Sequence, residues 1–148
     1  MRSTDRGTFI ARGQTTQIDG PVKLNIFDGT YKKGFRIVKF EVSGSATNAN
    51  NDCSGKLTTE EVLSTGDVWN WDDNREIAWA STNMFATGIR EPVASFIDSS
   101  IVVVEDLFVY VTSITSTSFL VNYMIELEPV MLREWEYGLN YVQNNSQG

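Results

Sequence analysis

The chain has 148 residues, of which 41% are hydrophobic and 11% aromatic, a composition that suits one folded domain with its own core. It contains no histidine and one cysteine, which excludes a Ser-His-Asp or Cys-His catalytic pair, a histidine-bound zinc and an internal disulfide. The net charge of −7 argues against general nucleic-acid binding, and we expect neither a secretory leader nor a membrane span.

The two signs of charge are unevenly distributed along the chain. Residues 1–40 contain eight basic and three acidic residues and have a net charge of +5, whereas residues 41–148 have a net charge of −12. This polarity could let the basic end of one copy meet the acidic body of another copy. The alternative is that folding interleaves both signs on one surface.

The N-terminal third predicts an arm followed by strands. Residues 1–7 are polar, charged and aperiodic, which indicates an extended arm, and residues 8–12 are a short strand candidate. Residues 22–27 and 35–42 alternate between apolar and polar side chains, which predicts a hairpin with one buried face. In the second strand, the core-facing side chains should be Val38, Phe40 and Val42.

The middle of the chain gives weaker signals. Residues 43–55 are a polar run that predicts a long surface loop. The spacing from Thr58 to Glu61 fits a capping box and indicates a helical turn over residues 60–63. A strand is expected at residues 76–80, followed by a connection through residues 86–92.

The strongest strand signals are at residues 101–114 and 119–128, joined by a turn at 113–118. Glu105 and Asp106 interrupt the first segment, as a bulge or a strand break would. The second segment alternates cleanly, which is typical of an antiparallel sheet with one wet face. Its expected buried face consists of Phe119, Val121, Tyr123, Ile125 and Leu127.

These elements predict an all-β fold, an antiparallel β-sandwich of jelly-roll type, because seven to nine strands occur without strand-helix alternation. The expected organisation is an extended N-terminal arm at residues 1–7, a sandwich domain at 8–128 and a C-terminal segment at 129–148. Pro129 could open a short helix in that last segment.

No residue pattern predicts an enzyme, a cofactor or a metal site. The chain has no glycine-rich phosphate loop, and its adjacent acids, Asp72-Asp73 and Glu105-Asp106, fit solvated turns better than a glycosidase pair. The oxygen-bearing side chains of residues 67–76 match no calcium loop and indicate a polar turn.

Two groups of residues are candidates for binding proteins. Arg2, Arg6 and Arg12 could reach an acidic neighbour from the N-terminal end. Beyond the expected sandwich, Trp135, Tyr137 and Tyr141 are of the side-chain types that are enriched at interface hot spots. The alternative for this second group is that the segment folds back on its own sheet.

A third group could bind sugar. Trp69 and Trp71 share a face of an extended segment, next to Asp72, and could form an aromatic platform for sugar rings. We expect a core-facing tryptophan pair instead, because large aromatic side chains are usually buried. Trp79, between two alanines, should also lie in the core.

Three segments, WNWDDNREIAWA (residues 69–80), EDLFV (105–109) and NYMIELE (122–128), together resemble small β-sandwich virion proteins of marine tailed bacteriophages, over residues 68–128. The resemblance implies a structural role in the virion, as a capsid decoration or cement protein or a minor capsid or tail component. The implied partners are other virion proteins, the major capsid protein among them, and further copies of the chain, without specific nucleic acid or membrane. The protein would be made in the host cytoplasm. The second function left open is a carbohydrate- or receptor-binding β-sandwich module of a tail or cell surface.

Overall fold

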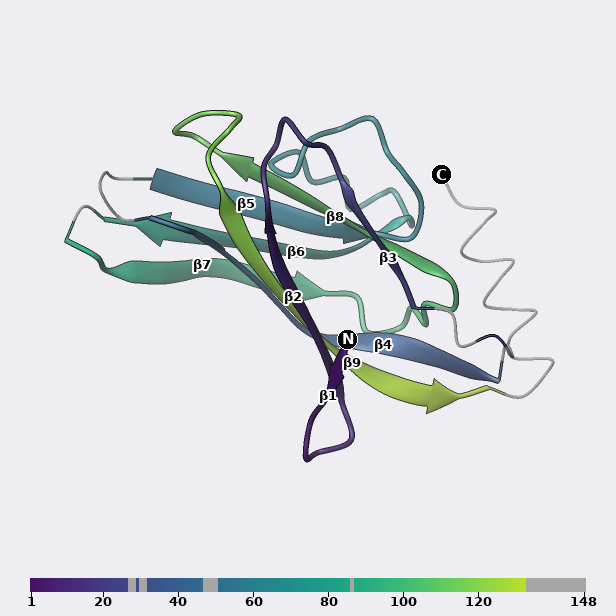
Figure 1. Ribbon diagram of the computed structural model, residues 1–148. Helices are drawn as coiled ribbons and strands as arrows, with labels where there is room; N and C mark the ends of the chain where they lie inside the picture. Colours follow the sequence, from purple (N-terminus) through teal and green to yellow (C-terminus); the bar gives the residue numbers. More distant parts are fainter. Residues whose placement is uncertain (27–28, 30–31, 47–50, 86, 133–148) are drawn as a thin grey trace.

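The computed structural model describes residues 1–26, 29, 32–46, 51–85 and 87–132. Within these residues the chain is all β, with two antiparallel sheets and no helix (Figure 1). The strands are β1 (Arg2–Ser3), β2 (Phe9–Thr15), β3 (Val22–Asn25), β4 (Lys33–Gly44), β5 (Asn51–Thr58), β6 (Glu76–Met84), β7 (Arg90–Ile97), β8 (Asp106–Ser113) and β9 (Val121–Met131). One sheet has the order β1-β2-β9-β4 and the other β3-β8-β5-β6-β7.

The apolar inner faces of both sheets form one core, in a sandwich-like arrangement. The alternation expected for β9 is confirmed, because Val121, Ile125 and Leu127 are fully buried while Met124 and Glu128 are exposed. The interruption at Glu105 and Asp106 is confirmed as well, since β8 begins only at Asp106. Trp79 is buried, as its alanine neighbours suggested.

Both predicted hairpins are wrong, although the strands themselves exist. β3 pairs with β8, whereas the following β4 pairs with β9 in the other sheet. Likewise β8 and β9 lie in different sheets, so the segment between them crosses from one sheet to the other. An amphipathic strand pattern specifies which face is buried but not which strand lies alongside.

The predicted inner face of β4 is wrong at Val38. The pairing of β4 with β9 shifts register between Ile37 and Lys39, so Val38 is an extra, bulged residue that is 41% exposed. Because a bulge reverses the alternation, Ile37 points into the core on one side of it and Phe40 on the other.

The surface loop predicted at residues 43–55 is also wrong at its second half. Residues from Asn51 onwards form β5, a central strand in which Cys53 and Leu57 are fully buried. Gly55 lies where the other sheet and the neighbouring strand both come close: a Cβ there would lie 2.8 Å from Val42 Cγ1 on β4 and 2.9 Å from the Tyr110 carbonyl oxygen on β8. The helical turn predicted at residues 60–63 does not form.

The strand prediction was too short in the next segment. β6 continues to Met84, beyond its predicted end at residue 80, and pairs with the unpredicted edge strand β7. Pro92 is tolerated in β7 because an edge strand needs backbone donors on one side only.

The N-terminal end differs from the predicted arm, and the predicted C-terminal helix does not begin at Pro129, while residues 133–148 lie outside the described residues. Arg2 and Ser3, expected in a free arm, pair with Ile10 and Phe9, so the N-terminus folds back as a hairpin. At the other end, Pro129 continues β9 opposite Phe35 instead of opening a helix. The missing N–H of Pro129 costs little there, because the backbone of Phe35 bonds instead to Val103, at 2.8 and 2.7 Å.

Candidate functional site

The N-terminal strands surround a hollow of about 420 Å³, which we call the basic hollow. It lies between β3, an edge of one sheet, and the β1–β2 hairpin at the edge of the other. Two of the predicted interface residues, Arg2 and Arg12, come together here. The lining consists of Met1, Arg2, Ile10, Ala11, Arg12, Lys23, Leu24, Asn25 and Ile26.

The charged residues that line the basic hollow are all basic. None of its lining residues is acidic, and within the described part of the chain Arg2 and Arg12 form no ion pair. Lys23 forms an ion pair with Asp106 on β8, with 3.5 Å between Nζ and Oδ2. The hollow therefore combines an apolar floor with a cationic rim, which suits an acidic segment with apolar side chains.

Arg6, the third predicted arginine, lies outside the hollow, in the turn of the β1–β2 hairpin. The turn is closed by the Thr4 N–H, which donates to the Thr8 carbonyl at 2.8 Å. The Arg6 side chain is 82% exposed and lies 3.9 Å from the Glu126 carboxylate. Such an exposed pair stabilises little and leaves Arg6 accessible.

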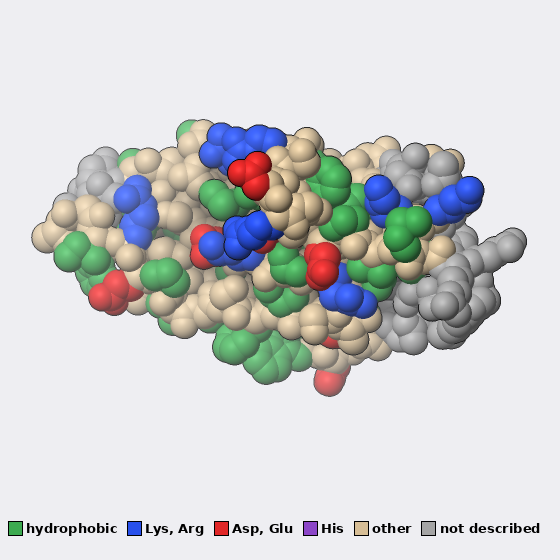
Figure 2. All heavy atoms as spheres, turned by 90° about the horizontal axis from the view of Figure 1, so that it is seen from below, with side chains coloured by type: hydrophobic (Ala, Val, Ile, Leu, Met, Phe, Trp, Pro, Cys, Tyr) green, Lys and Arg blue, Asp and Glu red, His purple; other side chains and the backbone are tan. Residues whose placement is uncertain are grey.

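Both signs of charge occur on the face of the molecule seen in Figure 2, where Lys and Arg lie among Asp and Glu.

A larger groove of about 650 Å³ runs from Arg12 across β9 and β4 to Arg90 on β7, and Glu41 contributes to its lining. It offers hydroxyl, amide and apolar groups but no pair of titratable groups poised for acid-base catalysis.

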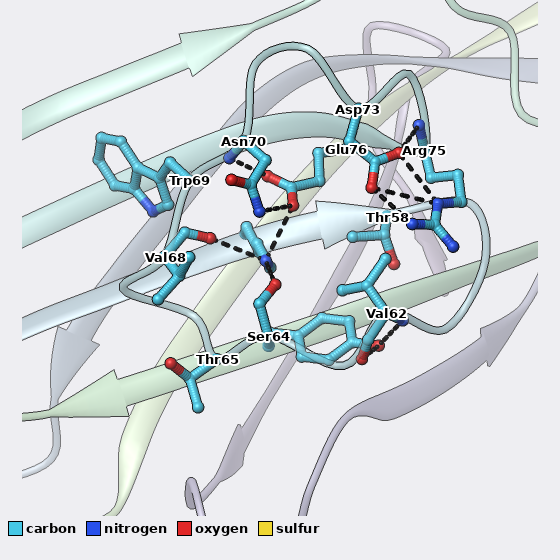
Figure 3. A network of polar contacts seen from close by, with 12 residues as sticks. Thr58, Val62, Ser64, Thr65, Val68, Trp69, Asn70, Asp73, Arg75 and Glu76 are labelled. Carbon is cyan, nitrogen blue, oxygen red and sulfur yellow. Dashed lines mark hydrogen bonds and ion pairs between the residues drawn. The ribbon is translucent and has the colours of Figure 1, made fainter. Parts of the chain in front are cut away.

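Residues 59–75, the covering loop, lie over the outer face of the five-stranded sheet (Figure 3). The loop is held by a buried ion pair between Lys56 on β5 and Glu76 on β6, with 3.0 Å between Nζ and Oε2 and both side chains fully buried. Lys56 also donates to the Val68 carbonyl at 2.8 Å and to the Ser64 hydroxyl. All three ammonium protons therefore have acceptors, two of them in the loop.

The Glu76 carboxylate extends this network toward the tryptophans. Its Oε1 accepts hydrogen bonds from the Asn70 backbone N–H at 2.8 Å and from the Trp79 indole N–H at 3.1 Å. A second anchor is Tyr110, whose hydroxyl accepts from the Val62 N–H at 2.7 Å. A buried charge pair is costly unless its hydrogen bonds are satisfied, and here they are.

The tryptophan prediction is wrong for Trp71 and partly right for Trp69. Trp71 is 61% exposed and packs its ring against Trp79 and Phe96 instead of entering the core. Trp69 is half-buried and donates its indole N–H to the Gly66 carbonyl at 2.9 Å. Asp72 is exposed beside them.

One acid of this loop, Asp73, is paired with a base. Asp73 accepts three hydrogen bonds from the Arg75 side chain, at 2.9, 3.2 and 2.7 Å, which lower the pKa of the Asp73 carboxyl. Among the described residues, no three cysteine, aspartate or glutamate side chains are grouped to hold a metal ion. Within residues 67–76, Asp73 forms an ion pair with Arg75.

The remaining candidate residues and the comparisons with known proteins do not narrow the choice of function. Trp135, Tyr137 and Tyr141 lie outside the described residues. No helix in the described ranges is long and apolar enough to cross a membrane. No family model matches the chain, and no curated protein or solved structure matches it.

Lys23 and Phe96 are the site residues that sequence reasoning missed. The alternation of residues 22–27 placed Lys23 on the outer face of its strand, but nothing in the sequence brought that strand next to Arg2 and Arg12. Phe96 lies on β7, the strand that was not predicted.

Proposed function

We propose that this chain is a structural protein of a virus particle that acts through protein–protein contacts and catalyses no reaction. The likeness of residues 68–128 to small β-sandwich virion proteins of tailed bacteriophages supports the location in a virion. Partners would be the major capsid protein or other virion proteins, with several copies of the chain per particle. The observation that carries the contact is the basic hollow, with its apolar floor and cationic rim.

A jelly-roll fold belongs to the same proposal. A jelly roll is a long antiparallel ribbon of eight strands that rolls up into two sheets. Its first strand pairs with the eighth, its second with the seventh, its third with the sixth and its fourth with the fifth. β2·β9, β3·β8 and β5·β6 pair in this way. The fourth pair, β4 and β7, meets through the Ser95 hydroxyl, which donates to the Phe40 carbonyl at 3.0 Å. In this proposal, the strand β1 and the pairing of β7 with β6 are additions to the jelly-roll arrangement.

The basic hollow would receive an extended acidic segment from a neighbouring subunit. Residues from Ala11 to Thr15 of β2 pair only with β9 among the described strands, and β3 pairs only with β8. The outer edges of β2 at residues 11–15 and of β3 at residues 22–24 can therefore offer backbone groups to an added strand. Arg2 and Arg12 would neutralise acids of that strand.

The other sheet edges are less suited to strand addition. The free edge of β4 is covered, because Thr82 and Ser95 donate their hydroxyls to the carbonyls of Val42 and Phe40. The free edge of β7 contains Pro92 and a register shift, two features that discourage pairing with another chain. These protections make the edge at the basic hollow the better docking surface.

The test co-expresses the chain with the other virion proteins of its genome and counts its copies per purified particle by quantitative mass spectrometry. We expect multiple copies for the native chain and a loss of about tenfold or more for Arg12→Glu, which places an acid in the hollow. Arg90→Glu makes the same charge change on β7 and should incorporate normally.

Two results would contradict this proposal. Particles that lack the native chain would overturn the structural role. Equal incorporation of Arg12→Glu and the native chain would show that the basic hollow is not part of the contact. The contact with the particle would then lie elsewhere on the surface.

A further inference from the structure

An aromatic cluster lies at the exposed end of a row of side chains on the outer face of the five-stranded sheet. Phe96, Trp79, Lys56 and Tyr110 are successive neighbours across β7, β6, β5 and β8. The covering loop lies over the Lys56 end of this row and places its own Trp71 against Phe96, which stays partly exposed.

The Phe96 end is an aromatic surface that we call the aromatic platform (Trp71, Trp79 and Phe96). The Trp71 ring lies 5.7 Å from Trp79 and 5.5 Å from Phe96, between ring centroids. Trp71 is 61% exposed and Phe96 47%, whereas Trp79 is buried beneath them. Exposed indole and phenyl rings backed by a buried ring are costly to leave in water without a ligand.

The platform is held in place before any ligand arrives. The Glu76 carboxylate accepts hydrogen bonds from both the backbone N–H of Asn70, the residue before Trp71, and the indole N–H of Trp79. Its charge is balanced by Lys56, at 3.0 Å. One buried carboxylate therefore fixes Trp79 and the backbone that precedes Trp71, and such preorganisation reduces the entropy lost on binding.

We propose that the aromatic platform binds a neutral, soluble oligosaccharide, by stacking pyranose rings on Trp71 and Phe96. The exposed side chains of Asn70, Asp72 and Asn74 lie next to Trp71 in the chain and supply amide and carboxylate groups for sugar hydroxyls. This binding is separate from the proposed structural role and does not depend on it.

The charge and size of the platform decide between the possible ligands. The net charge of −7 and the neighbouring acids disfavour nucleic acid and anionic glycans. Two half-exposed aromatic side chains are far smaller than the roughly 800 Å² per partner of a stable protein interface. An oligosaccharide of a few sugar units matches the size of the aromatic platform.

The tilt between the rings defines the shape of the ligand. Trp71 and Phe96 are inclined at 68° and Trp71 and Trp79 at 51°, so the platform is not flat. A flat crystalline polysaccharide could contact one ring only, whereas a flexible chain can turn between the two. The ligand class is therefore a soluble chain rather than an insoluble fibre.

The test presents the purified chain to an array of neutral gluco-, galacto- and manno-configured oligosaccharides, followed by titration calorimetry with the best binder. Trp71→Ala should weaken binding by about tenfold or more, whereas Trp71→Tyr, which keeps an aromatic face, should stay within about threefold. Leu63→Ala alters an exposed apolar residue of the same loop and should bind as the native chain does.

The proposal is overturned if no neutral oligosaccharide binds saturably, or if Trp71→Ala binds as tightly as the native chain. Because Trp71 is mostly exposed, its replacement should leave the melting temperature unchanged. If Trp71→Ala nevertheless unfolds, the same comparison is made with Phe96→Ala, for which the expected loss is also about tenfold.

Discussion

Lys56 and Glu76 are oppositely charged side chains that are fully buried between the sheet and the covering loop. Replacing one of them leaves the other as a lone buried charge, which is more costly than the pair itself. We expect Lys56→Met to lower the free energy of unfolding by about 3–5 kcal/mol. Urea denaturation of the native and variant chains measures the difference.

Two further variants separate the lost charge from the lost side chain. Glu76→Gln keeps an acceptor for the Asn70 and Trp79 N–H groups, so Lys56→Met combined with Glu76→Gln should recover part of the stability. Lys39→Met removes an exposed lysine that lies 3.6 Å from Glu41 and should cost below about 0.5 kcal/mol. A loss below about 1 kcal/mol for Lys56→Met would mean that the pair contributes little.

Cys53 is fully buried in β5, and this burial, with a smaller contribution from the Asp52 charge, raises the pKa of its thiol to about 11. In the unfolded chain the thiol ionises from about pH 8.5. The unfolded state therefore releases its proton first, so stability should fall as the pH rises from about 8.5 toward 11. Measured between pH 8 and pH 10.5, the native chain should lose about 1–2 kcal/mol more than Cys53→Ala; equal losses would show that the thiol does not contribute.

At the residue scale, sequence reasoning finds charges but not their environments. Arg2 and Arg12 stand out in the sequence as charges of a basic segment, but no local pattern indicates that both line one hollow. The burial of Lys56 was not predictable, because a lysine that follows a long polar run is normally a surface residue. Only the fold brings Glu76, 20 residues away, next to it.

Strand positions could be predicted wherever one face is apolar, and strand partners could not. The alternation in β9 gave its buried face correctly, because period two is a direct consequence of strand geometry. The partners of β8 and β9 depend on how two sheets are stacked, which no local pattern contains. β5 and β7 were missed because close sheet packing selects Gly55 on one and edge exposure permits Pro92 on the other.

The bulge in β4 gives adjacent residues opposite environments. Ile37 is 2% exposed and Val38 is 41% exposed. We therefore expect Ile37→Ala to lower the free energy of unfolding by about 2–5 kcal/mol and Val38→Ala by less than about 1 kcal/mol. Denaturant midpoints of the two variants measure this contrast. Equal losses would place the bulge elsewhere in the strand.

On the scale of the whole molecule, the basic N-terminal third does not form a separate charged arm. Lys23 is paired with Asp106 and Arg6 approaches Glu126, so part of its positive charge is matched by acids from the C-terminal half. Arg2 and Arg12 form no ion pair among the described residues and line the basic hollow, where the proposed contact would form.

Deleting residues 1–7 separates folding from partner binding. The deletion removes β1, which pairs with β2 through two residues only, and none of the buried core residues. We therefore expect the melting temperature, measured by circular dichroism, to fall by about 5 °C or less.

The same deletion removes Arg2 from the basic hollow and should weaken binding of an acidic partner. Added salt should weaken the native interaction in the same way, since exposed charges are screened over about 8–10 Å. The affinity of the truncated chain should consequently depend less steeply on salt than that of the native chain. A parallel salt dependence would mean that Arg2 makes no contact with the partner, and a large loss of melting temperature would mean that the β1–β2 hairpin stabilises the sheet edge itself.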